Sequence, residues 1–353
     1  MVSLDPIVAR IFKEAADLGA SDIHLEPEEH GLRLRYRVGG LMREGPLLDT
    51  ALQEALVAKL KLLARLDSTQ LLAPQDGAFV IGGTQVRLSV IPALGGESVV
   101  MRLFRRVGEL ERLEGLGLLP AQIADIKKAI APMHGLLIIA GPTGSGKTTT
   151  FYATLRAIDP AAQKIITVED PVEQRLEGVC QTPVGPQSPS AAPARRENGP
   201  MERLTFSTAL RSILRQAPNV IGVGELRDLE SARMALQAAL TGHLVVATLH
   251  ADSAAGVPAR LTDMGLEPTI LAEVLCGVIS QRLLQGRGAC PQGAFEVLLP
   301  TAAVRQAIKA RHSSAAIEVL LAQEKFFGMR QSAEAMVRAG KVNEEAVLAE
   351  FFA

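Results

Sequence analysis

Residues 135–150 read GLLIIAGPTGSGKTTT, an apolar run followed by a glycine-rich stretch and a run of threonines. Positions 141–148 within it match GxxxxGK[ST], the pattern of a P-loop. The pattern follows a predicted buried strand and opens a predicted helix, which is the context that its mechanism needs. Glycines let backbone amides wrap around phosphate groups, and the amino end of a helix favours anions. The segment therefore predicts a phosphate-binding loop at the end of a sheet strand.

The side chains of this loop add the chemistry of a nucleotide site. Lys147 can reach the β- and γ-phosphates, and the Thr148 hydroxyl can bind Mg²⁺. The alternative is a glycine-rich turn that binds nothing, and the flanking strand and helix argue against it. The predicted nucleotide-binding residues of the loop are Gly141, Pro142, Thr143, Gly144, Ser145, Gly146, Lys147, Thr148 and Thr149.

Strand-like and helix-like segments alternate after the loop. This order predicts a parallel sheet with helices on its faces, and so an α/β fold. Residues 182–200 interrupt the order with five prolines among Ser, Ala, Gly and Asn, and they predict a mobile surface loop. The strand patterns lie at 164–170, 219–225 and 243–250, and the helix patterns lie at 206–216 and 229–240.

The chain divides into four parts by pattern. Residues 1–105 begin with an amphipathic helix and continue with strands in which Arg alternates with apolar residues, so they predict a smaller α+β domain. Charges and glycines at 106–119 predict a linker. Residues 120–300 are the predicted P-loop domain, and 301–353 are a predicted helical C-terminal segment.

Acidic residues follow two of the predicted strands. Glu169 and Asp170 end the segment ITVED, Glu173 comes shortly after, and Glu225 ends VIGVGE. In an open parallel sheet the carboxyl ends of the strands meet at one edge, so these acids can serve a metal ion and an attacking water beside the P-loop. The alternative is that acids follow strands because loops are polar. That alternative is weaker for Glu225, which ends a long apolar run, than for Glu173.

Two histidines flank the predicted strand LVVATL. His250 follows its carboxyl end, where a histidine can sense or polarise a γ-phosphate, whereas His243 precedes the strand and is better placed to hold a turn. Taken alone, each histidine favours a structural role. A histidine-based metal site is not expected, because no Cys or His lies nearby at ligand spacing.

The composition excludes several classes of protein. The chain has 353 residues, 48% of them hydrophobic, and 37 Lys and Arg against 38 Asp and Glu, so it is globular and has no basic excess for nucleic acid or anionic lipid. No amino-terminal signal or membrane-spanning run is predicted, since runs such as 136–140 are too short. The three cysteines, Cys180, Cys276 and Cys290, are too far apart for a disulfide framework and fit a reducing cytosolic setting.

The ordered motifs resemble those of the GspE/PilB family of secretion and pilus-assembly ATPases, within the type II/IV secretion ATPase superfamily. The resemblance covers nearly the whole chain. Besides the P-loop segment, it rests on ASDIHLEP (20–27), IITVEDPVE (165–173), ILRQAPNVIGVGELRD (213–228) and TGHLVVATLHADSA (241–254).

The resemblance implies a homo-hexameric ring of RecA-like ATPase domains preceded by a PAS-like domain. ATP turnover with Mg²⁺ would drive domain rotations against a platform protein at the cytoplasmic face of the inner membrane. Glu225 would be the Walker B glutamate that orients water, with Glu169 as a second catalytic acid. Glu169, Asp170 and Thr148 would lie at the metal, and His243 and His250 would be the paired histidines at the nucleotide. Arginines of the N-terminal domain would reach phosphate, with a solvated strand face as the alternative; the candidates are Arg35, Arg37, Arg87 and Arg102.

The chain also departs from the family pattern. A four-cysteine insertion is missing, since only Cys290 lies in that interval, so no zinc is expected. The chain begins at the family's second domain, which leaves its recruitment to the membrane open. Ala217-Pro218-Asn219 stands where Asp-Pro-Asp is common, and Ala78 stands where the family often has Arg. These changes leave the predicted hydrolytic residues in place.

The sequence supports an assembly motor better than three other functions. A nucleotide-binding scaffold with little hydrolysis would more often have lost one of the acids or Lys147. A retraction ATPase of the PilT type would carry an AIRLIREG-like segment near its end, which is absent from the sequence. A nucleic-acid motor would need basic and aromatic channel loops, and the chain has no Trp and a net charge of -1. No nucleic-acid partner is expected.

Overall fold

The computed structural model describes residues 4–104, 112–184, 204–286 and 291–352. The chain forms two compact units, Met1–Arg106 and Val107–Ala353. Most of the loop predicted at 182–200, part of the linker predicted at 106–119, and Cys290 lie outside the described residues. Each unit is described by itself.

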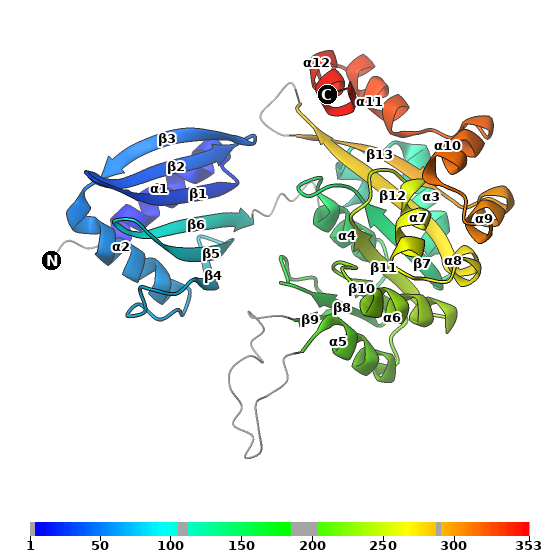
Figure 1. Cartoon of the computed structure of the whole chain (residues 1–353), viewed down its shortest axis with the longest axis horizontal. Helices are drawn as coiled ribbons and strands as arrows, with labels where there is room; N and C mark the ends of the chain where they lie inside the picture. Colours follow the sequence, from blue (N-terminus) through cyan, green and yellow to red (C-terminus); the bar gives the residue numbers. More distant parts are fainter. Residues whose placement is uncertain (1–3, 105–111, 185–203, 287–290, 353) are drawn as a thin grey trace. The chain divides into compact units, whose positions relative to one another are not determined.

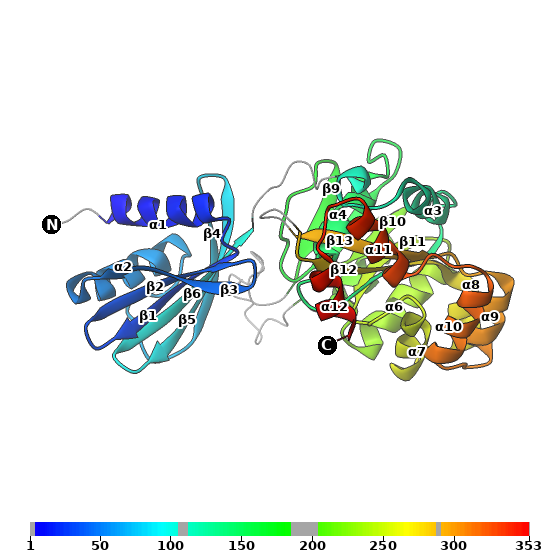
Figure 2. The same cartoon turned by 90° about the horizontal axis from the view of Figure 1, so that it is seen from above.

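The first unit is a six-stranded antiparallel sheet with two helices on one face (Figures 1 and 2). Pro6 lies in the first turn of α1, which ends at Gly19 in the left-handed conformation that glycine favours. Apolar residues of both helices and of alternate strand positions form one core. The strand order is β3-β2-β1-β6-β5-β4. The bounds are α1 (Asp5–Leu18), β1 (Asp22–Glu28), β2 (Gly31–Val38), β3 (Leu41–Leu48), α2 (Thr50–Leu63), β4 (Gln75–Ile81), β5 (Thr84–Ala93) and β6 (Gly96–Phe104).

The two faces of this sheet differ because side chains alternate along a strand. Leu34 and Tyr36 of β2 are buried in the core, whereas Arg35 and Arg37 lie on the other face. The register places Arg37 opposite Asp22 in β1, Asp22 opposite Arg102 in β6, and Arg102 opposite Arg87 in β5. The strand pattern of Arg alternating with apolar residues thus produces a row of charges across the open face.

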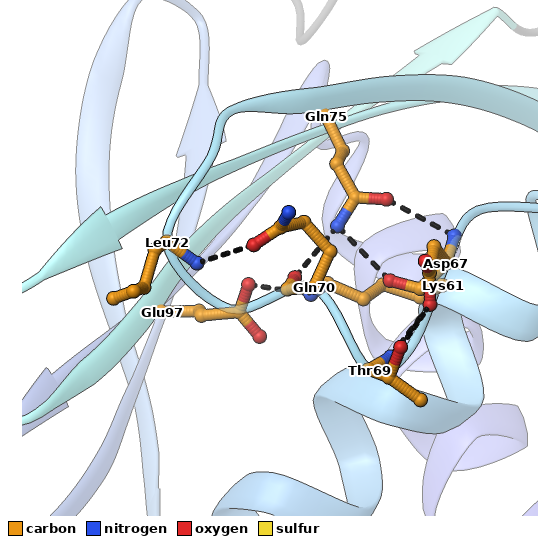
Figure 3. A network of polar contacts seen from close by, with 7 residues as sticks. All are labelled: Lys61, Asp67, Thr69, Gln70, Leu72, Gln75 and Glu97. Atoms are coloured by element: carbon orange, nitrogen blue, oxygen red, sulfur yellow. Dashed lines mark hydrogen bonds and ion pairs between the residues drawn. The ribbon is translucent and has the colours of Figure 1, made fainter.

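A polar network holds the connection from α2 to β4 (Figure 3). The fully buried Lys61 Nζ lies 2.5 Å from Glu97 Oε1 of β6 and donates a hydrogen bond of 2.8 Å to the Gln70 carbonyl. Gln75 donates to the carbonyls of Asp67 and Gln70 at 3.0 and 2.9 Å. A buried ammonium needs such partners to offset the loss of its hydration.

The second unit contains a seven-stranded sheet in the order β13-β12-β7-β11-β10-β8-β9. Its strands are parallel apart from β13, which runs antiparallel to β12. The central strands are buried along their whole length, as expected for a sheet covered on both faces. The bounds are β7 (Gly135–Ala140), β8 (Ile165–Glu169), β9 (Val179–Pro183), β10 (Val220–Val223), β11 (Leu244–Leu249), β12 (Leu275–Leu284) and β13 (Gln292–Leu298).

Helices cover both faces of this sheet (Figures 1 and 2). One apolar core joins the strands to α3 (Pro120–Ile130), α4 (Lys147–Arg156) and the short 3₁₀ helix η2 (Leu113–Gly115). A second core on the opposite face joins them to six further helices. Those helices are α5 (Phe206–Ile213), α6 (Leu229–Leu240), α7 (Gly256–Asp263), α8 (Pro268–Val274), α9 (Ala302–Lys309) and α10 (Ser314–Gln323). The short 3₁₀ helix η4 (Leu214–Gln216) follows α5.

The predicted C-terminal helical segment therefore divides between two packing environments. Its first two helices, α9 and α10, belong to the main core of the sheet. The last two, α11 (Met329–Arg338) and α12 (Glu344–Phe352), pack with the ends of β12 and β13 in a small separate core. Within the described part of the chain, no helix has the length and apolar character needed to cross a membrane.

Candidate nucleotide site

The P-loop connects β7 to α4 in the middle of the sheet, where the sequence predicts it. Gly144 and Gly146 have φ angles of 79° and 88°, a region that side-chain-bearing residues rarely occupy. A Cβ on Gly141 would lie 2.5 Å from Ser145 Oγ and 2.6 Å from the Gln281 carbonyl oxygen. Glycine is therefore required at these positions by backbone conformation or by close packing, and the loop's amides lead directly into the amino end of α4.

Lys147 folds back over the loop. Its Nζ donates hydrogen bonds of 2.8 Å to the carbonyls of both Gly141 and Pro142. Burial lowers the pKa of Lys147, the nearby Glu225 carboxylate opposes that effect, and Arg282 adds to it. An ammonium held in this way can exchange its carbonyl partners for phosphate oxygens.

The ends of three parallel strands bring together charged side chains predicted from separate motifs. His250 Nε2, after β11, lies 2.7 Å from Glu225 Oε1, after β10. Arg227 Nε lies 2.5 Å from the other oxygen of Glu225, and its Nη1 lies 3.4 Å from Asp170 Oδ2, after β8. The hydrogen bond to Glu225 raises the pKa of Arg227. The carboxylates at this edge therefore share one arginine.

Two members of this site were missed by the sequence analysis. Arg227 could have been found from its place two residues after Glu225. Gln281 could not have been found in this way, because it lies on β12, far from the P-loop in sequence. Its side chain is 1% exposed, and its Nε2 donates a hydrogen bond of 2.5 Å to the Ser145 carbonyl of the P-loop.

Glu169 has a different environment from Asp170 and Glu225. Its carboxylate is buried and accepts hydrogen bonds from the Tyr152 hydroxyl, from Thr167 Oγ1 at 2.5 Å and from Gln181 Nε2 at 3.0 Å. These partners are protein groups from α4, β8 and β9. Protein donors therefore use three of the roughly four acceptor sites of this carboxylate, which leaves Glu169 little capacity for a metal ion or a water molecule.

The two histidines lie at opposite ends of β11. His243 precedes the strand, and its Nδ1 lies 3.0 Å from the Ala238 carbonyl and 3.2 Å from Thr241 Oγ1, at the end of α6. Only His250 lies at the P-loop edge of the sheet. The structure does not bring His243 together with the other predicted site residues within this unit, because β11 separates them.

The four candidate arginines belong to the N-terminal unit. Arg35 Nη2 lies 2.5 Å from Glu26 Oε1, while Arg37 and Arg102 lie 3.5 and 2.9 Å from the carboxylate of Asp22. Arg87 is exposed. Their contact with phosphate stays a prediction, and three of the four already have an acidic partner within the N-terminal unit.

The loop fits the triphosphate of a nucleotide, since its glycines, its lysine and a helix amino end are those that phosphate binding requires. Thr148 lies in the first turn of α4 and can offer its hydroxyl to Mg²⁺. Within the described ranges, no group of three or more His, Cys, Asp or Glu residues could hold a metal ion.

Comparisons with known proteins identify sequences that are similar to this chain. A family model described as type II/IV secretion system protein matches residues 2–349. The chain is 44% identical over 283 residues to the type II secretion system protein HxcR of Pseudomonas aeruginosa, covering 79% of this chain and 57% of that protein. It is 42% identical over 289 residues to the type II secretion system ATPase E of Vibrio cholerae, covering 81% and 54%. The chain spans about half the length of the curated relatives that it matches.

Solved structures confirm the predicted fold. A pilus retraction motor, PilT with bound ADP, matches with a TM-score of 0.72 and 29% identity, over 98% of this chain and 97% of that one. The DotB ATPase of Legionella pneumophila matches with a TM-score of 0.76 at 22% identity, over 98% and 95%. The second unit therefore has the predicted α/β, RecA-like arrangement of a parallel sheet around a P-loop.

Proposed function

The chain belongs to the type II/IV secretion system protein family, and on that premise we propose that it is an ATP-hydrolysing motor of a secretion or pilus machine. The reaction is the conversion of ATP and water to ADP and phosphate. In this proposal, ATP hydrolysis drives the assembly of a type II secretion pseudopilus or a type IV pilus at the inner membrane.

The observation that carries the proposal is the placement of Glu225 at the P-loop edge, bonded to His250 on one oxygen and to Arg227 on the other. A carboxylate fixed in this way can accept a hydrogen bond from the attacking water and hold it in line with the γ-phosphate. His250 is then placed to respond to the γ-phosphate. Lys147 neutralises charge that develops on the transferred group.

Mg²⁺ would be held by the Thr148 hydroxyl and by oxygens of the nucleotide, with Asp170 as the carboxylate at the same edge. When bound, the ion neutralises phosphate charge and orients the chain of phosphates. Asp170 shares Arg227 with Glu225, so binding of the ion and positioning of the water would be linked through that arginine.

The family resemblance supports a proposal about partners. We propose a homo-hexamer at the cytoplasmic face of the inner membrane, docked there through a platform protein. Assembly is favoured over retraction because relatives at 42–44% identity are named as type II secretion proteins, whereas the retraction motor is 29% identical. The alternative function, that of a retraction motor, is supported by the match of PilT over 98% of the chain.

Steady-state ATP hydrolysis as a function of protein concentration tests the proposal, with Glu225→Gln beside the wild-type chain. We expect activity that rises faster than linearly and is lost in the variant, while a fluorescent ATP analogue still binds. ATP binding without hydrolysis at every concentration would favour a nucleotide-binding scaffold. Unchanged turnover in Glu225→Gln would contradict the assignment of that residue.

A further inference from the structure

Tyr152 connects the P-loop helix to the segment that carries Asp170. It lies on α4, one and a half turns after Lys147, and is 3% exposed. Its hydroxyl donates to Glu169 and accepts hydrogen bonds from the backbone amides of Glu173, at 3.0 Å, and Gln174, at 3.2 Å. A phenol hydroxyl has one donor and two acceptor sites, so all of its hydrogen-bonding capacity is used.

Glu169 completes this network from the other side. Its second oxygen accepts hydrogen bonds from the Thr167 hydroxyl and from the side-chain amide of Gln181 in β9. The Gln181 side-chain amide also donates a hydrogen bond of 2.8 Å to the Gln174 carbonyl. The Gln181 side-chain oxygen in turn accepts a hydrogen bond of 2.7 Å from the Leu176 backbone amide. The backbone from 169 to 176 is therefore tied at both of its ends to groups that are buried or half-buried.

The charge of Glu169 explains why so many donors converge on it. A carboxylate that is 3% exposed has lost nearly all of its hydration and needs several hydrogen bonds to remain in the interior. Tyr152, Thr167 and Gln181 supply them from three different elements. Burial also raises the pKa of Tyr152, which keeps its hydroxyl protonated and able to donate.

We propose that Tyr152 and Glu169 are positioning residues that fix the segment from Asp170 to Gln174 relative to the P-loop helix. The inference rests on the proposed ATPase function, because the segment so fixed carries Asp170. Asp170 contacts Arg227, and Arg227 contacts Glu225. The network around Tyr152 and Glu169 therefore determines where the acidic residues at this edge of the site lie. Glu169 acts on the protein here and touches neither the metal ion nor the water.

This proposal differs measurably from a direct role of Glu169 at the metal. If Glu169 bound Mg²⁺, Glu169→Gln would raise the Mg²⁺ concentration needed for half-maximal rate, and Tyr152→Phe would not. If both residues position the segment, either substitution lowers kcat, and the two change that concentration by the same factor, because both act through the segment that carries Asp170. Substituting both together would cost little more than substituting one, because the same network is already broken.

The chain supplies a matched control. It has two tyrosines, and Tyr36 in the N-terminal unit is also buried, with its hydroxyl 2.7 Å from Glu14 Oε2. Tyr36→Phe and Tyr152→Phe each remove one buried hydroxyl that donates to a glutamate. A merely structural role predicts similar effects of the two on thermal stability and none on kcat.

The experiment measures kcat, KM for ATP and Mg²⁺ dependence for the wild-type chain, Tyr152→Phe, Glu169→Gln, their combination and Tyr36→Phe. Amide hydrogen exchange over 170–176 is measured on the same proteins. We expect Tyr152→Phe to lower kcat by about 10- to 100-fold with KM changed by about twofold or less, as displacement of groups at a reacting site does. Exchange at Glu173 and Gln174 should become faster, and Tyr36→Phe should leave both readouts unchanged.

Two outcomes would overturn the inference. One is a kcat for Tyr152→Phe equal to that of Tyr36→Phe, and the other is unchanged exchange at Glu173 and Gln174. A wild-type chain that hydrolyses no ATP would contradict the proposed function instead. In that case the exchange measurement still decides whether Tyr152 and Glu169 fix the segment.

Discussion

His250 Nε2 lies 2.7 Å from Glu225 Oε1, although the two residues follow different strands and belong to different sequence motifs. The contact exists because β10 and β11 are adjacent and parallel, with Val223 opposite Ala247 in register. Their carboxyl ends therefore reach the same edge of the sheet, beside the P-loop strand β7. Under the proposed function, in which Glu225 orients the attacking water, His250 can report the state of the γ-phosphate to that carboxylate.

Substitution of His250 by Gln should lower kcat for ATP hydrolysis by about 10- to 100-fold, the usual contribution of a group that positions a catalytic carboxylate. KM should change less, because the P-loop rather than His250 holds the nucleotide. The matched control is His312→Gln, which alters an exposed histidine between α9 and α10. Equal kcat values for the two variants would remove His250 from the site.

Gln281 offers a prediction about nucleotide affinity. Gln281→Leu removes the hydrogen bond to the Ser145 carbonyl and should raise KM for ATP by about fivefold, since one hydrogen bond contributes about 1 kcal/mol. The control is Gln122→Leu, because Gln122 is also buried and donates a hydrogen bond of 2.7 Å to a backbone carbonyl, but to that of Phe295 in β13. A KM increase of the same size in Gln122→Leu would mean that general loss of stability is responsible.

The difference between His250 and Gln281 shows what the sequence can reveal. His250 was predicted because it follows an apolar strand, and the carboxyl ends of parallel strands share an edge. Gln281 lies on a strand whose pairing with β7 depends on the sheet order, and no local pattern encodes that order. The same holds for Tyr152, which looks like an ordinary helix residue until β8 and β9 supply its partners.

The fold itself was largely predictable. Glycines, hydrophobic periodicity and the P-loop pattern are local signals, and they predicted the α/β class that the solved structures confirm. The sequence did not predict that the C-terminal helices divide between the main core and a small separate core. Helices α10 and α11 both carry apolar residues, but α10 packs in the main core and α11 packs in the small separate core. Long-range packing decides this, because each apolar stripe can fit several surfaces.

The buried pair Lys61 and Glu97 yields a prediction about stability. Lys61→Met leaves the Glu97 carboxylate buried without its cation and the Gln70 carbonyl with Gln75 alone as donor, and it should lower the free energy of unfolding of the N-terminal unit by about 3–5 kcal/mol. Adding Glu97→Gln should restore part of the loss, because no charge then remains buried. Denaturant unfolding in a Tyr152→Phe background follows this unit through Tyr36, the only remaining tyrosine. A double variant as unstable as the single one would contradict this account.

The two tyrosines yield a prediction about pH. Burial is the main cause that raises the pKa of both Tyr36 and Tyr152, and a hydrogen bond to a glutamate adds to the effect in each. A raised pKa in the folded state means that the folded chain holds the proton more tightly than the unfolded chain does. The stabilisation is therefore fully present below about pH 10, the unfolded value, and is lost as the pH rises above it.

The phenolate absorbance of the native chain should accordingly stay flat as the pH passes 10. It should rise only where the protein unfolds, and then for both tyrosines together with the loss of circular dichroism. In denaturant both should titrate near 10, which gives the reference amplitude. Since the Tyr152 hydroxyl must stay protonated to donate to Glu169, phenolate formation in the folded chain before unfolding would contradict the network around Glu169. In the Tyr36→Phe variant the remaining signal belongs to Tyr152 alone, so the measurement can be made on that residue directly.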